Sequence, residues 1–127
     1  MTFIVSRQNV YYEDRQIFQA PAEILWTAFL DNSIIVLYDG DEVLPHNSHH
    51  GSSQDRKPTK QELFEANKNI VRLDSKGNAL WYVKAGSGDD GTAGYRSIFK
   101  SGVHGWTVNA GKYKYRLNIE TGETDMI

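Results

Sequence analysis

Three histidines in one stretch come nearest to the spacing of a metal site. His46, His49 and His50 lie within five residues of one another, and two imidazoles at this spacing could reach one zinc ion. The only further ligands nearby are the carboxylates of Asp41 and Asp55. Because serine, asparagine and glycine surround the histidines, the stretch is more typical of a solvated loop. We therefore expect neither a metal nor a cofactor here.

Acidic residues gather at two places in the chain. Asp39, Asp41 and Glu42 directly follow an apolar run, and Asp89 and Asp90 lie in a glycine-rich stretch. Carboxylates at this density could bind calcium or magnesium, but the spacing of a complete calcium-binding loop is absent. We expect solvated acids in turns, which together could form a negatively charged face.

The glycine-rich stretch has the letters of a nucleotide-binding motif. Residues 86–91 match G-x-G-x-x-G, but the motif binds phosphate only between a strand and a following helix. Here a strand is expected to follow at Tyr95, and the carboxylates of Asp89 and Asp90 would repel phosphate. The G-x-S-x-G pattern of a serine nucleophile and any cysteine are both absent. We therefore predict no catalytic residues and no enzyme activity.

Bulk composition limits the classes of function. A chain of 127 residues predicts one domain over 1–127, and the lack of cysteine excludes disulfides. The net charge is −2 and the 14 Lys and Arg are scattered, which disfavours nucleic acid as a partner. No signal sequence is evident, and no apolar run approaches the roughly 20 residues that span a bilayer. We expect a cytoplasmic protein without membrane contact.

Short apolar runs separated by glycine-bearing turns predict β-strands almost throughout. The expected strands are 2–12 with a bend at Gln8 and Asn9, 16–20, 24–30, 34–38, 69–74, 79–84, 95–99, 103–108, 112–119 and a short final strand. For 24–30 a helix is the alternative, because Pro21 suits a first helical turn. Residues 39–67 form one long irregular stretch, in which Thr59 and Glu62 could cap a short helix over 59–66.

Two segments of the chain share a sequence pattern. Residues 70–81 and 115–125 each contain an apolar strand, a polar turn closed by glycine (Gly77 or Gly122) and a second run. The offset from Arg72 to Arg116 is 44 residues, close to the roughly 40–45 residue period of four-stranded propeller blades. Two blades do not close a ring. We therefore predict an all-β antiparallel meander, forming a sandwich or half-barrel with propeller-like hairpins and at most one short helix.

The same segments carry a family resemblance. An apolar strand ending in acid (34–39) precedes Asn-Ile-x-x-Leu-Asp-x-x-Gly-x-x-Leu-Trp at 69–81 and Tyr-x-x-x-Leu-Asn-x-x-Thr-Gly at 113–122. This pattern, over about two thirds of the chain, resembles small bacterial β-rich immunity proteins of polymorphic toxin and contact-dependent growth inhibition systems. The resemblance implies a cytoplasmic, single-domain antitoxin that binds one toxin domain, and it carries over no catalytic residues.

The expected function is therefore protein binding: an immunity protein that neutralises a cognate secreted toxin domain, in particular a nuclease, by covering its active site. We expect a monomer that binds the toxin one to one, with acidic side chains facing a basic toxin and aromatic side chains as anchors. The candidate partner-binding residues are Asp39, Asp41, Glu42, Asp89, Asp90, Tyr95, Trp106 and Tyr113.

Three alternatives stay open. The 39–55 stretch could serve a small ligand- or sugar-binding module or a metal-dependent enzyme. An open sheet edge could make the chain self-associate. Trp26, Trp81 and Trp106 are expected to pack between strands, although an exposed aromatic platform is the alternative for them.

Overall fold

The computed structural model describes residues 2–30, 32–40, 68–83, 95–103, 105–110 and 113–127. Within these ranges the chain forms eleven strands and no α-helix, so the predicted all-β fold is confirmed. The strands are β1 (Phe3–Ser6), β2 (Asn9–Tyr12), β3 (Arg15–Gln19), β4 (Ile24–Leu30), β5 (Ser33–Tyr38), β6 (Ile70–Asp74), β7 (Ala79–Tyr82), β8 (Tyr95–Ser101), β9 (Gly105–Ala110), β10 (Tyr113–Leu117) and β11 (Thr124–Met126).

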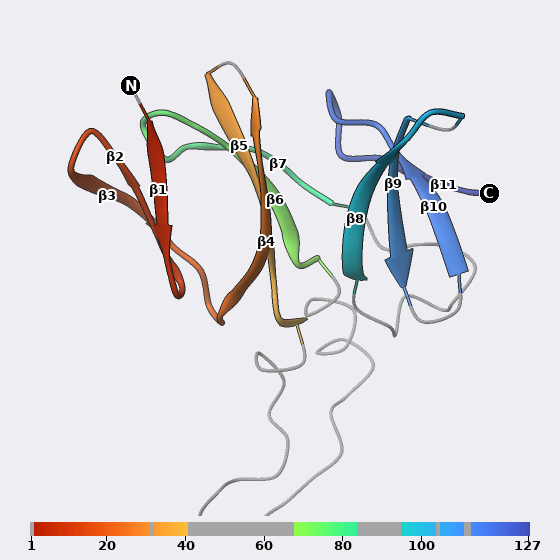
Figure 1. The fold of residues 1–127 in the computed structure, drawn as a ribbon, viewed down its shortest axis with the longest axis horizontal. Coiled ribbons are helices and arrows are strands. Elements are labelled where there is room, and N and C mark those ends of the chain that lie inside the picture. Colours follow the sequence, from red (N-terminus) through yellow and green to blue (C-terminus); the bar gives the residue numbers. More distant parts are fainter. Residues whose placement is uncertain (1, 31, 41–67, 84–94, 104, 111–112) are drawn as a thin grey trace, which may run out of the picture.

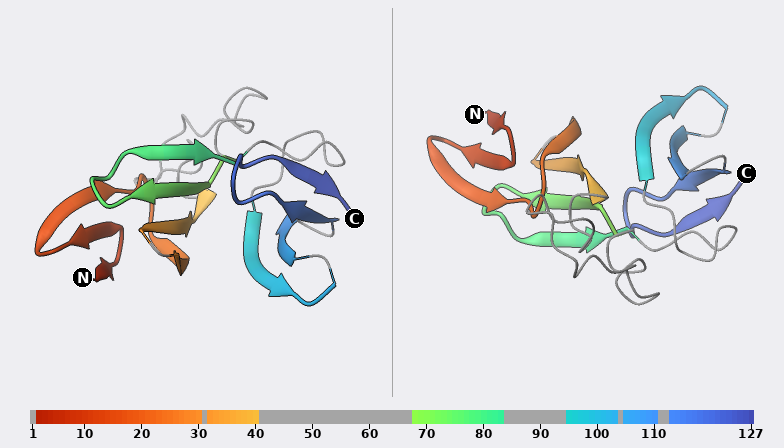
Figure 2. Two further views of the ribbon diagram at one scale, coloured as in Figure 1. Left: turned by 90° about the horizontal axis from the view of Figure 1, so that it is seen from above. Right: turned by 90° about the horizontal axis from the view of Figure 1, so that it is seen from below.

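The strands form three antiparallel sheets in chain order. The N-terminal sheet is β1-β2-β3, the middle sheet is β4-β5-β6-β7 and the C-terminal sheet is β8-β9-β10-β11. Figure 1 shows the sheets side by side along the long axis, and the views from above and below in Figure 2 keep the same order. The expected meander is thus divided among three layers, one more than a two-sheet sandwich has.

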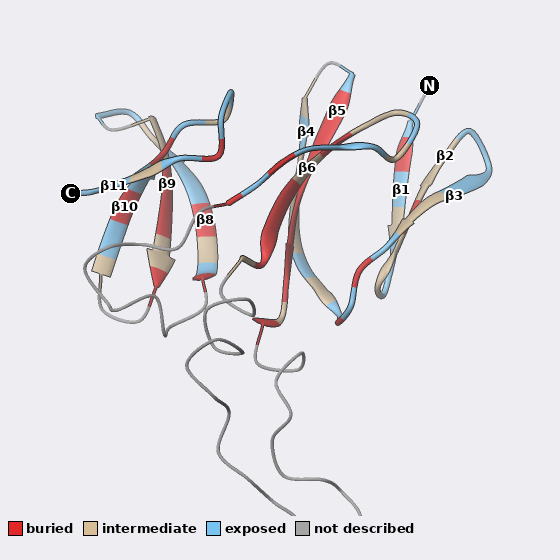
Figure 3. Ribbon diagram, turned by 180° about the vertical axis from the view of Figure 1, so that it is seen from behind, coloured by how far each residue is buried: buried red, intermediate tan, exposed pale blue. Residues whose placement is uncertain are grey.

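The middle sheet requires a neighbour on each face because β5 is buried on both sides. All six of its residues are buried, as Figure 3 shows in red. Ile34 and Val36 pack toward the N-terminal sheet, whereas Ile35 and Leu37 pack toward the C-terminal sheet. A strand buried on both faces reads as a continuous apolar run, and a sheet with one wet face would leave half of that run in water.

The repeated sequence pattern corresponds to the third and fourth strands of two consecutive sheets, β6–β7 and β10–β11. Both turn glycines have left-handed backbone, with φ of 87° at Gly77 and 80° at Gly122. A Cβ atom on Gly77 would overlap the carbonyl oxygen of Ile17 in β3, and one on Gly122 would lie 2.7 Å from Cε3 of Trp81 in β7. Each turn therefore docks its sheet against the last strand of the preceding sheet, and only glycine fits there.

A buried asparagine joins the middle and C-terminal sheets. The side chain of Asn69 is fully buried and donates from Nδ2 to the carbonyl oxygens of Tyr38 (2.7 Å) and Tyr95 (2.8 Å). Its Oδ1 accepts a hydrogen bond from the Tyr95 backbone N–H at 3.1 Å. The first residue of the 69–81 motif thus links the end of β5 to the start of β8.

The structure differs from the predicted elements at two turns. The single strand expected over 2–12 is a hairpin of β1 and β2, whose turn places Arg7 at a φ of 57°. Gln8 and Asn9 predict a bend close to this turn, but the sequence lacks the glycine or Asn-Gly signal that usually marks a tight hairpin. In the C-terminal sheet, β9 begins at Gly105, two residues later than the expected start at 103.

The helical alternative for 24–30 is wrong, because this segment pairs with β5 as strand β4. The short helix considered over 59–66 lies outside the described residues.

Candidate functional site

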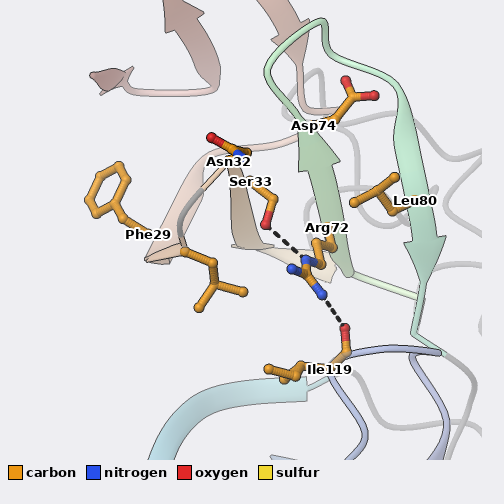
Figure 4. A pocket seen from close by; sticks show the side chains of 8 residues that line it. Phe29, Asn32, Ser33, Arg72, Asp74, Leu80 and Ile119 are labelled. Carbon is orange, nitrogen blue, oxygen red and sulfur yellow. Dashed lines mark hydrogen bonds between the residues drawn. The ribbon is translucent and has the colours of Figure 1, made fainter. Parts of the chain in front are cut away.

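An open hollow of about 780 Å³ lies where the middle and C-terminal sheets meet. It is formed by the β4–β5 hairpin, by β6 and β7, and by the turn between β10 and β11. Figure 4 shows it from close by. Its lining residues are Phe29, Leu30, Asn32, Ser33, Arg72, Asp74, Leu80 and Ile119.

The guanidinium of Arg72 is held in place at two points. Its Nε donates to the hydroxyl oxygen of Ser33 at 2.9 Å, and its Nη1 donates to the carbonyl oxygen of Ile119 at 2.8 Å. The same Ile119 oxygen accepts a hydrogen bond from Nε1 of Trp81 at 2.7 Å. Ser33 is buried, with 4% of its surface exposed, so the packing around it fixes the position of the hydroxyl that accepts from Arg72. Arg72 therefore ties the middle sheet to the C-terminal sheet.

Most of the hydrogen-bonding capacity of Arg72 is unused within the described part of the chain. An arginine side chain carries five N–H donors, and the two bonds above use two of them. Among the described residues, no carboxylate pairs with this side chain. In Figure 4 the third guanidinium nitrogen carries no dashed line. A fixed positive charge with free donors thus faces the hollow.

Asp74 also lines the hollow, but its carboxylate serves the β6–β7 turn. Oδ1 accepts hydrogen bonds from the backbone N–H groups of Lys76 (2.9 Å) and Asn78 (3.0 Å), and Oδ2 accepts one from the Asn78 side chain (3.3 Å). These bonds, led by the one from the Asn78 backbone, hold the pKa of Asp74 below its usual range. The carboxylate stays ionised, and in Figure 4 it points away from Arg72.

Apolar side chains form the remaining walls. Phe29 is 58% exposed and Leu80 is 52% exposed, while Leu30 and Ile119 are partly buried. Aromatic and aliphatic walls beside a charge are typical of binding sites, because they exclude water and strengthen the electrostatic interaction. The hollow could therefore bind a group that combines apolar surface with negative charge.

None of the residues predicted to bind a partner lines this hollow. Tyr95 is only 2% exposed, its ring meets Tyr115 edge-on at 6.0 Å, and its hydroxyl lies 3.5 Å from that of Thr124. The expectation that Tyr95 anchors a partner at the surface is therefore corrected, since its ring belongs to the core. Tyr113 is partly buried against the same core.

The other predicted residues lie elsewhere. Trp106 is partly buried, with its ring 6.3 Å from that of Trp26 and 5.9 Å from the Lys100 ammonium. Asp39 follows β5, is partly exposed, and donates its backbone N–H to the Glu23 carbonyl at 2.9 Å. Asp41, Glu42, Asp89 and Asp90 lie outside the described residues, as do His46, His49 and His50.

The three tryptophans pack between sheets, as expected. Trp81 is buried in the core between the middle and C-terminal sheets, and Trp26 and Trp106 pack against that core.

The sequence pattern includes Arg72 as one position of the repeat and assigns it no function. One signal could have revealed it, because Arg72 is a charged residue in a strand whose neighbours Ile70, Val71 and Leu73 are all apolar. In a strand buried on both faces, such a charge needs a fixed set of partners or a ligand.

Comparison of the chain with protein-family models, curated protein sequences and solved structures finds no match. Across the described residues, no three His, Asp or Glu side chains are grouped to hold a metal ion. The same residues contain no helix with the length and apolar character needed to cross a membrane.

Proposed function

We propose that this chain is a protein-binding inhibitor, an immunity protein that docks on a toxin domain and blocks it. The observation that carries the proposal is the hollow around Arg72, where a fixed guanidinium lies beside the exposed side chains of Phe29 and Leu80. The role against a toxin comes from the resemblance of the 69–81 and 113–122 motifs to immunity proteins.

The composition of the hollow fits a protein interface. Arginine and aromatic side chains dominate the residues that carry binding energy between proteins, and they favour sites where apolar neighbours exclude water. Arg72 is already held by Ser33 and Ile119, so binding would cost little additional side-chain entropy. Phe29 and Leu80 would leave water on docking, which adds a favourable hydrophobic contribution.

The scaffold supports a preformed binding surface. The turns at Gly77 and Gly122 fix each sheet against the preceding one, and Asn69 ties two sheets through three buried hydrogen bonds. An inhibitor gains affinity from such preorganisation because little conformational entropy is lost on binding. The nuclease activity of the toxin, a one-to-one complex with a monomer and a cytoplasmic location belong to the same proposal.

The test is co-production of the chain with the toxin domain encoded beside it. We expect rescue of growth and a one-to-one complex by mass measurement in solution. Phe29→Ser should weaken the complex, because it removes an exposed aromatic side chain at the rim of the hollow. Phe99→Ser is the matched control, since Phe99 is 39% exposed on β8 and does not line the hollow. Absence of a complex at micromolar concentration, or equal weakening by both variants, would count against the proposal.

A small-molecule binding module is the second candidate. The volume of the hollow, about 780 Å³, lies within the roughly 300–1,000 Å³ range of ligand sites. Thermal stabilisation of the purified chain by a small acid or sugar, without any complex with the toxin domain, would favour this alternative.

A further inference from the structure

We infer that the hollow receives a carboxylate from an aspartate or glutamate side chain of the protein partner, bound by the free N–H groups of Arg72. This deepens the proposed function and rests on it, because it names the chemical group of the partner that enters the site.

The free donors are distributed over two nitrogens of one guanidinium, which allows a carboxylate to bind at two points. Nε–H and one N–H of Nη1 are bonded to Ser33 and Ile119, so the free N–H groups belong to the adjacent nitrogens Nη1 and Nη2. N–H groups on neighbouring guanidinium nitrogens match the two oxygens of one carboxylate, which makes the pair strong and directional. The two internal bonds would hold the fork still while the ligand binds.

The charge around the hollow favours a carboxylate over a phosphate. Within the described part of the chain, no carboxylate pairs with Arg72, so an entering anion could bond to its guanidinium directly. The ionised Asp74 lies in the same hollow and is committed to its own turn. Its negative charge would repel a doubly charged phosphate more than a singly charged carboxylate. The walls of Phe29 and Leu30 suit the methylene groups of an acidic side chain.

The openness of the site favours a protein segment over a free small acid. Phe29 and Leu80 are 58% and 52% exposed at the rim. A small acid seated on Arg72 would leave both in water, whereas a polypeptide carrying the acidic residue would cover them with its neighbouring side chains. The preferred occupant is therefore an acidic residue with apolar neighbours in the partner's sequence.

The experiment titrates the isotopically labelled full chain with acetyl-Leu-Glu-Phe-amide and follows the Nε–Hε resonance of Arg72 by NMR. We expect a saturable shift of this resonance. The matched peptide with glutamine in place of glutamate should bind about tenfold more weakly or worse, because it lacks the charge-assisted pair. Equal binding of the two peptides, or shifts confined to other parts of the protein, would overturn the inference.

Two further ligands separate the sources of the anion. Acetate should bind more weakly than the glutamate peptide, since it covers neither rim residue. Acetate binding as tightly as the peptide would overturn the assignment to a protein side chain, and tighter binding of inorganic phosphate would overturn the assignment to a carboxylate.

Variants test the residue itself. Arg72→Gln should abolish the preference for glutamate, and Arg72→Lys should weaken it because a lysine keeps the charge without the fork. Arg116→Gln is the matched control, since Arg116 occupies the equivalent repeat position on β10, is exposed, and does not line the hollow. Loss of the preference in the Arg116 variant as well would contradict the site. The two Arg72 variants also lose an inter-sheet bond, so the glutamate-to-glutamine comparison on the unchanged chain remains decisive.

The outcomes for function and ligand are separable. A chain that prefers the glutamate peptide but forms no complex with the toxin domain would refute the proposed function alone. A chain that forms the complex with unchanged affinity after Arg72→Gln would refute the carboxylate site alone.

Discussion

Replacing Gly122 by alanine tests the contact that docks the C-terminal sheet on the middle sheet. Gly122 has a φ of +80°, and a Cβ atom there would lie 2.7 Å and 2.8 Å from two ring carbons of Trp81 and 3.1 Å from the carbonyl oxygen of Tyr82. The left-handed backbone costs an alanine about 1–2 kcal/mol. Displacing the buried ring of Trp81 adds about 1–3 kcal/mol, as overpacking does. We expect a total loss of about 2–5 kcal/mol, a large share of the roughly 5–15 kcal/mol that stabilises a domain.

Two other glycines separate these contributions. Gly105 has a φ of +73° and nothing within 4 Å of an added Cβ, so Gly105→Ala should show the backbone cost alone, about 1–2 kcal/mol. Gly102 has neither a left-handed φ nor a neighbour within 4 Å. Gly102→Ala should therefore be neutral or stabilising by up to about 1 kcal/mol.

The assay is urea unfolding followed by tryptophan fluorescence, with the free energy of unfolding obtained by linear extrapolation. The predicted order of stability is Gly102→Ala, then Gly105→Ala, then Gly122→Ala. Equal losses at Gly105 and Gly122 would refute the reasoning, because the additional cost at Gly122 comes only from its contact with β7.

Three further predictions concern the buried polar groups and the turns. Asn69→Ala should lower the free energy of unfolding by about 2–4 kcal/mol in the same urea assay, because it removes three buried hydrogen bonds at the junction of the middle and C-terminal sheets; a loss under about 1 kcal/mol would argue against the buried link. Burial, with a smaller contribution from Tyr82, raises the pKa of Tyr38 to about 12. The stabilisation by the protonated Tyr38 hydroxyl is therefore complete below the unfolded pKa of about 10, and it is lost as the pH rises from there through the folded pKa. Urea midpoints from pH 8 to 12 should therefore fall less steeply in Tyr38→Phe than in the unchanged chain, and parallel curves would contradict this. Because hydrogen bonds lower the pKa of Asp74, its contribution is present above the unfolded pKa of about 3.9 and is lost as the pH falls through the folded value. Asp74→Asn should reduce the loss of stability on acidification. If the stability of this variant falls with acidic pH as steeply as that of the unchanged chain, the hydrogen bonds of the Asp74 carboxylate do not stabilise the fold.

The all-β fold class could be predicted from local sequence patterns. The run at 34–38 is short, β-branched and bounded by turn residues, so it predicts a buried strand, and the structure shows that both of its faces are buried. The shared sequence pattern around Gly77 and Gly122 predicts two equivalent hairpins, and the structure places both as the last hairpin of a four-stranded sheet. The number of sheets could not be predicted. It depends on which consecutive strands pair with each other and which belong to different sheets, and the local pattern does not specify this.

The hollow could not be read from sequence because its parts meet only after folding. Arg72 bonds to Ser33, 39 residues before it, and to Ile119, 47 residues after it. The Ile119 partner is a backbone carbonyl, which carries no signal in the side-chain pattern. Tyr95 was misplaced for a related reason, since alternation along β8 does not say which of its two faces meets the middle sheet.

The most direct test of the central claim is a crystal structure of the full chain with the glutamate peptide. The account predicts both carboxylate oxygens of the peptide within hydrogen-bond distance of Nη1 and Nη2 of Arg72, with the bonds to Ser33 and Ile119 kept and the peptide's apolar side chains against Phe29 and Leu80. A peptide bound elsewhere, or a guanidinium whose remaining donors are bonded to a carboxylate of this same chain, would contradict it.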